Sequence, residues 1–153
     1  MELSDRQHAF LALARSLLRS DRTVERVIDE ALRTHHDLGL REMFVLSLLE
    51  PGPLRPGQIA VELNLPAPSV TRASERLVSR GVVERRPGTR DRRHVALALT
   101  DSGHDLLQRA RADLARALAD AWPDVDADRA ADLARGLDAL TDRPARADPD
   151  ASS

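Results

Sequence analysis

The chain has no cysteine, no lysine and no tyrosine, and its 153 residues include only one tryptophan and two phenylalanines. Without cysteine the protein can form no disulfide and cannot sense oxidants through a thiol. No apolar run reaches the roughly 18 residues that a membrane-spanning helix needs. The N-terminal sequence MELSDRQHAF has neither the basic start nor the apolar core of a secretion signal. We therefore expect a cytoplasmic protein that does not interact with a membrane.

Arginine supplies all 23 basic residues. It suits bidentate contacts with guanine and phosphate, but a GC-rich coding sequence would produce the same bias, so the missing lysine alone indicates nothing. The position of the charges is more informative than the net charge of −2. Residues 68–94 contain eight arginines and three acidic residues, whereas residues 101–142 contain ten aspartates and five arginines. Only the first of these segments suits a polyanion such as DNA.

Patterns of catalytic and metal-binding residues are missing from the sequence. Ser69 and Ser74 have neither a histidine close by nor the elbow glycines of a hydrolase nucleophile. The five histidines, at positions 8, 35, 36, 94 and 104, include no pair at the i, i+4 spacing of metal ligands on a helix. A glycine-rich loop for phosphate is also missing. We therefore predict that the protein is not an enzyme and needs no metal or cofactor.

The stretch Ile59–Thr100 has the pattern of helix, turn, helix and hairpin. Its first helix is short and ends before Pro66 and Pro68, because two prolines cannot continue a helix. The second helix is predicted from about Pro68 to Arg80 and ends at Gly81, which tolerates the left-handed conformation that follows many helices. This order is typical of a winged helix-turn-helix, whose second helix enters the major groove of DNA.

The predicted second helix has one apolar side and one polar side. At about 100° per residue, the apolar side carries Val70, Ala73, Leu77 and Val78. The polar side carries Arg72, Glu75, Arg76 and Ser79, with Ser69 and Thr71 at the borders. The apolar side would pack on the preceding helices, while the polar side offers groups that hydrogen-bond to base edges and phosphates.

A hairpin with a cationic tip follows. Val82–Arg86 is predicted to be one strand, and the alternation of Val95, Leu97 and Leu99 indicates a second, half-buried strand. The tip between them is rich in arginine, which favours an anionic partner such as a narrow minor groove. Asp91 is expected to hold the tip in shape by accepting hydrogen bonds from a neighbouring arginine or from loop amides.

These motifs resemble the signature of MarR-type transcriptional regulators. The residues that carry the resemblance are Val70-Thr71-Arg72, Arg80-Gly81-Val82-Val83, Asp91-Arg92-Arg93, Leu99-Thr100 and Gly103. The resemblance covers roughly residues 5–141, and the wing motif is its most specific part. It implies a mainly α fold with a small β-wing, made of a winged helix-turn-helix DNA-binding lobe and a helical dimerisation lobe. It also implies a homodimer that binds double-stranded DNA at a pseudo-palindromic operator and responds to a small aromatic or apolar effector.

The two lobes are assigned to separate segments. Residues 1–36 form the N-terminal part of the dimerisation lobe, either as one helix or as two in tandem. The DNA-binding lobe occupies residues 38–100, and helices in residues 101–141, the first of them capped by Asp101, complete the dimerisation lobe. Residues 142–153 are rich in proline, aspartate and serine and are predicted to be disordered. The Leu- and Ala-rich helices would form either a dimer interface or a self-contained three-helix core.

The residues before the motif add detail to this fold. Leu40–Leu49 is predicted to be a strongly apolar helix, and Leu54 and Arg55 a short third strand beside the hairpin. The N-caps of the two motif helices would be Arg55 and Pro66, where similar regulators usually have Ser, Thr or Asp. Neither side chain accepts a hydrogen bond from an exposed amide, so each missing cap would cost about 1 kcal/mol.

The resemblance also assigns functional residues. The DNA-binding residues are Pro68, Ser69, Thr71, Arg72, Arg76, Arg85, Arg90, Arg92 and Arg93. Among these, Arg72 would contact guanine, Arg76 and Arg85 would bind phosphates, and the wing arginines would reach the minor groove. A possible effector pocket is predicted from Phe10, Leu13, His36, Leu40 and Phe44, although plain packing would also give an apolar surface there. The predicted function is that of a transcriptional repressor released by a small molecule. The alternative is a winged-helix protein-interaction module that does not bind DNA.

Overall fold

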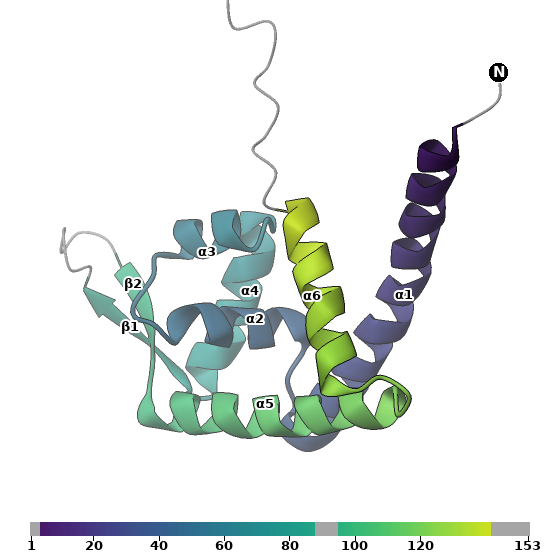
Figure 1. Cartoon of the computed structure of the whole chain (residues 1–153). Helices are drawn as coiled ribbons and strands as arrows, with labels where there is room; N and C mark the ends of the chain where they lie inside the picture. Colours follow the sequence, from purple (N-terminus) through teal and green to yellow (C-terminus); the bar gives the residue numbers. More distant parts are fainter. Residues whose placement is uncertain (1–3, 88–94, 142–153) are drawn as a thin grey trace, which may run out of the picture. The chain divides into compact units, whose positions relative to one another are not determined.

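A computed structural model describes residues 4–87 and 95–141, which form six helices and two strands (Figure 1). The helices are α1 (Asp5–His36), α2 (Leu40–Leu49), α3 (Pro56–Glu62), α4 (Ala67–Ser79), α5 (Asp101–Ala121) and α6 (Ala127–Thr141). The strands are β1 (Val83–Pro87) and β2 (Val95–Leu99). The predicted mainly α fold with a small β-wing is confirmed. The chain divides into two compact units, Met1–Leu118 and Ala119–Ser153.

Helix α1 is one continuous helix of 32 residues, which decides between the two predicted arrangements. It begins with a capping box, in which the Ser4 hydroxyl accepts a hydrogen bond from the Gln7 amide and the Gln7 side chain accepts one from the Ser4 amide. Its C-cap is Asp37, whose φ of 49° lies in the left-handed region. Among its described side chains, buried ones occur only near the C-terminal end, at Ala31 and Leu32.

Helices α2, α3 and α4 pack around one apolar core (Figure 1). From α4, Val70, Ala73 and Leu77 are buried, as the helical periodicity predicts, and Ser74 is buried beside them. Each fully buried Val or Leu side chain contributes about 1.5–3 kcal/mol relative to an exposed one. These contacts therefore fix which side of α4 faces outward.

The caps of α3 and α4 are Arg55 and Pro66, as predicted, and neither makes a side-chain cap. At α3 the opposite half of a capping box is present, because the Gln58 side chain accepts a hydrogen bond of 3.0 Å from the Arg55 amide. The turn between the helices contains Asn64 at φ 48°, a left-handed conformation that asparagine tolerates. The chain thus reverses at Asn64, before it reaches the two prolines.

The wing is a two-stranded antiparallel sheet in which Val83 of β1 pairs with Leu99 of β2. The predicted third strand is a single bridge between Leu54 and Leu97, made by two backbone hydrogen bonds of 3.0 and 2.8 Å. The sequence predicts a half-buried β2, but every residue from Ala96 to Leu99 is buried. That prediction is wrong at both faces: Val95, assigned to the buried side, is 50% exposed, while Ala96 and Ala98 of the other side are buried, since the small side chain of an alanine needs little cover.

Thr100 joins the wing to α5. Its Oγ1 accepts a hydrogen bond of 3.1 Å from the Gly103 amide and donates one of 2.8 Å to the Gly81 carbonyl. Thr100 is therefore the N-cap of α5, and the prediction of Asp101 at this place is wrong by one residue. Asp101 is the first helical residue, where a carboxylate still interacts favourably with the helix dipole.

The second unit contains α6. The Asp126 carboxylate caps this helix by accepting a hydrogen bond of 2.8 Å from the Arg129 amide. The helix side chains from Ala127 to Ala139 are all exposed. Two of them are large and apolar, Leu133 and Leu137. An apolar stripe of this kind is a surface that has no cover within its own unit.

Candidate nucleic-acid interface

The outward side of α4 carries the residues predicted to contact bases. Pro68, Thr71 and Arg72 are exposed, and Ser69 is half-buried. Thr71 Oγ1 donates a hydrogen bond of 3.0 Å to the Ala67 carbonyl, which leaves its oxygen free to accept another. Arg72 makes no ion pair or hydrogen bond with residues 4–87 or 95–141. Helix α4 therefore presents an uncommitted guanidinium on its outward side.

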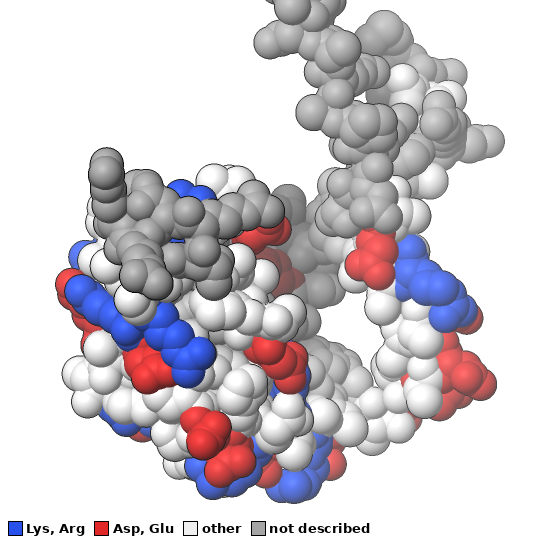
Figure 2. All heavy atoms as spheres, turned by 90° about the vertical axis from the view of Figure 1, so that its left-hand side faces the viewer, with Lys and Arg blue, Asp and Glu red and all other residues white. Residues whose placement is uncertain are grey.

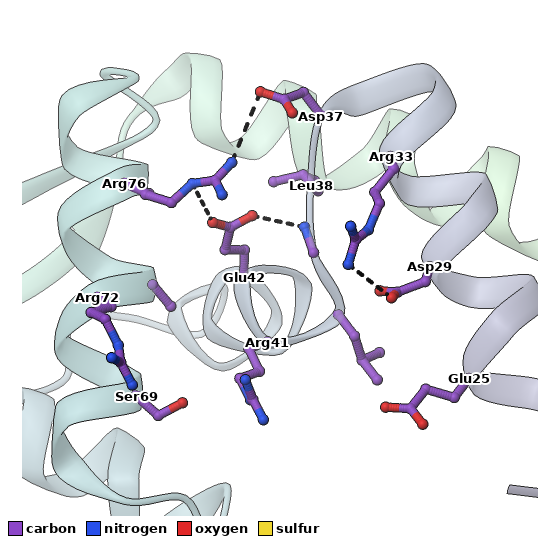
Figure 3. Close-up of a pocket in the computed structure, with 13 residues that line it drawn as sticks. Glu25, Asp29, Arg33, Asp37, Leu38, Arg41, Glu42, Ser69, Arg72 and Arg76 are labelled. Carbon is purple, nitrogen blue, oxygen red and sulfur yellow. Dashed lines mark hydrogen bonds and ion pairs between the residues drawn. The ribbon is translucent and has the colours of Figure 1, made fainter. Parts of the chain in front are cut away.

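Arg76 and Arg80 follow one and two turns later, and both are engaged within the protein. Arg76 Nε lies 2.9 Å from Glu42 Oε1, and Arg76 Nη2 lies 4.0 Å from Asp37 Oδ2 (Figure 3). Arg80 donates hydrogen bonds of 2.7 Å to the Asp37 carbonyl and 2.8 Å to the His36 carbonyl. The two arginines thus attach α4 to the turn between α1 and α2.

Glu42 is the buried partner in this attachment. Its side chain is only 7% exposed, and its Oε2 accepts a hydrogen bond of 2.7 Å from the Gly39 amide. A buried carboxylate is costly unless it is paired and hydrogen-bonded, and Glu42 meets both conditions. Sequence reasoning did not identify this residue, although the only carboxylate in the mostly apolar α2 is a signal that could have found it.

A cleft of about 510 Å³ lies between α1, the start of α2 and α4 (Figure 3). Its charged lining comprises the acidic residues Glu25, Asp29, Asp37 and Glu42 and the arginines Arg33, Arg41, Arg72 and Arg76. Arg33 is paired with Asp29 at 3.0 Å across one turn of α1. The lining therefore carries equal numbers of positive and negative side chains, and it includes Arg72 of the outward side of α4.

The residues of the predicted effector pocket lie in different places. Leu40 lines the cleft. Leu13 is exposed on α1 and Phe44 is exposed on α2, while His36 is half-buried at the end of α1. The Phe10 side chain lies outside the described part of the structure. Of the five predicted residues, the structure brings Leu40 to the cleft and does not place Leu13, His36 or Phe44 in its lining.

The ring of His36 contacts α5 instead. His36 Nε2 lies 2.9 Å from Asp113 Oδ2, and Arg116 Nη1 lies 2.8 Å from Asp113 Oδ1. The hydrogen bond to His36 holds the pKa of the Asp113 carboxyl below its ordinary value of 3.8, and Arg116 lowers it further against the opposing effect of desolvation. Helix α5 is also joined to the end of α2, because Arg111 Nη1 lies 2.7 Å from Glu50 Oε1.

The wing supplies one described arginine with a free guanidinium. Arg85 is exposed on β1 and has no ion-pair partner in the segments that the structure describes, whereas Arg86 pairs with Glu84 of the same strand. Figure 2 faces the side of the wing strands and shows arginine and acidic side chains mixed on this surface. The predicted tip residues Arg90, Asp91, Arg92 and Arg93 lie outside the described residues.

The described segments offer neither a metal site nor a membrane-spanning helix. Within residues 4–87 and 95–141, no group of three His, Asp or Glu side chains could hold a metal ion. None of the helices in these segments combines the length and the apolar character that crossing a bilayer requires.

The chain matches a family model in its central part and solved structures over most of its length. Residues 40–95, from α2 to the first residue of β2, match the family model described as the MarR family. A search of curated proteins finds no match. Among solved structures, the transcriptional regulator BldR from Sulfolobus solfataricus is similar with a TM-score of 0.81 and 20% sequence identity, over 93% of this chain and 100% of that one.

Two further similar structures contain a bound molecule. A mutant MarR from E. coli complexed with operator DNA has a TM-score of 0.71 at 24% identity, over 90% of this chain and 99% of that one. CouR from Rhodococcus jostii bound to p-coumaroyl-CoA has a TM-score of 0.74 at 21% identity, over 87% and 94%. The segment from α2 to the start of β2 is therefore similar to the MarR family, and the chain has the fold of MarR-family transcriptional regulators.

Proposed function

We propose that the protein is a homodimeric, sequence-specific DNA-binding regulator of transcription, which acts as a repressor and is released by a small molecule. The observation that carries the proposal is the outward side of α4. Its opposite side is fixed in the core, and Arg72 has no partner among the residues that the structure describes. The family match of this lobe and the operator complex of the similar MarR support the proposal.

In this proposal α4 enters the major groove of the operator. Arg72 reads a guanine through two hydrogen bonds, and Ser69 and Thr71 contact neighbouring base edges or phosphates. Arg85 on the wing binds a phosphate. The tip arginines, which lie outside the described residues, enter the adjacent minor groove. Each phosphate contact releases counterions, so the affinity must fall steeply with salt concentration.

The dimer is proposed from apolar side chains that the single chain leaves exposed. They are Leu11, Leu13 and Leu17 on α1 and Leu133 and Leu137 on α6, with exposed fractions between 38% and 56%. A second copy that covered these leucines would gain part of the roughly 1.5–3 kcal/mol that full burial of each side chain provides. A two-fold dimer would then place two α4 helices about 34 Å apart, one turn of DNA, on a pseudo-palindromic site.

The release step is assigned to the cleft of Figure 3. Its lining comes from α1, α2 and α4, so a ligand there would contact both the long helix α1 and the proposed recognition helix α4. A ligand that binds more tightly when α4 is displaced would shift the protein toward that state and weaken the DNA complex. The similar fold of CouR, bound to p-coumaroyl-CoA, supports a small-molecule effector.

The test of the proposed function is binding to a duplex that the wild-type protein selects from a random-sequence library. Arg72→Ala is expected to cost about 1–3 kcal/mol and to relax specificity at one base pair of each half-site. Arg109→Ala removes the same charge from an exposed position on α5 and is the control. If wild-type binding is weak and does not change between about 50 and 200 mM salt, phosphate contacts are not its basis, and the protein-interaction module becomes the better reading.

A further inference from the structure

Arg72, Arg76 and Arg80 follow one another at four-residue spacing along α4 and its C-cap, but only Arg76 and Arg80 have partners among the residues that the structure describes. We propose that Arg76 is a positioning residue: its ion pair with Glu42 holds α4 at the angle at which Arg72 meets the bases. The family resemblance predicts that Arg76 contacts a phosphate. In the role proposed here it does not. The inference rests on the proposed function, because it concerns how the DNA-reading helix is held.

The burial of Glu42 supports this assignment. Its side chain is 7% exposed, whereas the Arg76 side chain is 59% exposed, so the carboxylate depends on the guanidinium for much of its compensation. The Gly39 amide supplies the only other hydrogen bond to this carboxylate from the described residues. An Arg76 that moved away to bind phosphate would leave a buried, partly unpaired charge, which is strongly destabilising. The pair is therefore expected to persist in the DNA complex.

Arg80 provides a second attachment one turn further along the helix. Its two hydrogen bonds go to the carbonyls of His36 and Asp37, at the end of α1. Helix α4 is thus attached at two positions one turn apart, once to the Glu42 side chain of α2 and once to the backbone at the end of α1. Together these attachments restrict both the tilt of α4 and its rotation about its own axis. Arg72 lies one turn before Arg76 and depends on that rotation for its direction.

The experiment measures affinity for the selected operator duplex and for a scrambled duplex of the same length, over a series of salt concentrations. Arg76→Met and Glu42→Met are each expected to weaken operator binding about tenfold. A loss of this size is within the range expected when the bidentate contact of Arg72 with a base is misplaced. Binding to the scrambled duplex and the salt slope should change little. Arg85→Met, the control for a phosphate contact, should weaken both duplexes alike and lower the slope by about 0.9 for each phosphate that is no longer neutralised.

The double variant Glu42→Met/Arg76→Met separates positioning from folding. It leaves no unpaired buried charge, so it is expected to fold even if a single variant does not. Because both changes remove the same pair, it should bind the operator no more weakly than either single variant. Circular dichroism verifies the fold of each protein.

Two results would overturn the inference in distinguishable ways. If Arg76→Met lowers the salt slope as much as Arg85→Met does and Glu42→Met binds like the wild type, Arg76 is a phosphate contact and only the inference is wrong. If the wild-type protein binds neither duplex at low ionic strength, the proposed function fails and the inference fails with it.

Discussion

Gly103, the third residue of α5, leaves the least room for a Cβ atom among the glycines that the structure describes. A Cβ atom here would lie 2.0 Å from the Val82 carbonyl oxygen and 3.0 Å from the Val82 carbonyl carbon. Contacts of a Cβ below 3.0 Å are essentially never found. The obstacle is backbone, which cannot rotate away as a side chain does. Gly103→Ala must therefore push the start of α5 away from Val82 by roughly 1 Å.

The expected cost follows from what this displacement breaks. Overpacking costs about 1–3 kcal/mol. The hydrogen bond from the Thr100 amide to the Val82 carbonyl and the cap between Thr100 and Gly103 contribute about 1 kcal/mol each. Alanine regains about 1 kcal/mol of helix propensity over glycine. We therefore expect Gly103→Ala to lower the free energy of unfolding by about 2–4 kcal/mol, and the Tm by about 4–16 °C.

The assay is thermal and urea unfolding followed by circular dichroism, with Gly136→Ala as the matched control. Gly136 also lies inside a helix, α6, but a Cβ there would meet nothing within 4 Å. Only the gain in helix propensity applies, so this variant should be as stable as the wild type or more stable. A Gly103→Ala protein that unfolds at or above the wild-type temperature would refute the close contact between α5 and Val82.

The remaining predictions concern single hydrogen-bonded contacts, each measured by urea unfolding. Asp113→Asn should destabilise the protein at neutral pH. The folded-state pKa of Asp113 lies below 3.8, so the contribution of its carboxylate to the free energy of unfolding is complete above that pH and is lost as the pH falls through the folded-state pKa. A difference in stability between the variant and the wild type that persists in acid would contradict this origin. Thr100→Val should cost about 1–2 kcal/mol by removing the cap of α5, and an unchanged midpoint would exclude that cap. Arg80→Lys should cost about 1 kcal/mol, because an ammonium cannot reproduce a fork on two carbonyls, whereas Arg41→Lys, at an exposed position, should be neutral.

The elements of the DNA-binding lobe could be predicted from the sequence because their signals are local. Apolar periodicity set the buried side of α4, and the predicted range of about 68–80 differs by one residue from the observed Ala67–Ser79. The bounds of α2 agree with Leu40–Leu49. The burial of β2 could not be predicted in the same way, because it depends on which residues cover its second face. That information lies in elements distant in the sequence.

The cleft shows the same limit for the candidate site. The resemblance assigns the apolar residues Leu13 and Phe44 to an effector pocket, but an apolar residue does not specify its neighbour. The lining that the structure shows is charged, and its α1 part repeats every fourth residue, at Glu25, Asp29 and Arg33. Such spacing puts three side chains on one stripe of a helix. The sequence contains that stripe, but the element that it faces is known only from the fold.

The arginines of α4 show why one residue type can have opposite tasks on one helix. Residues four apart differ in direction by about 40°, and residues eight apart by about 80°. Arg72 therefore points to the outward side, whereas Arg76 and Arg80 point increasingly toward the turn between α1 and α2. There Arg76 pairs with Glu42, and Arg80 donates hydrogen bonds to two backbone carbonyls. Arginine suits both tasks, because its rigid fork of donors matches a guanine edge as well as a pair of carbonyl oxygens. The absence of lysine is thus compatible with internal attachment and with DNA recognition alike, and only the partner of each guanidinium separates the two.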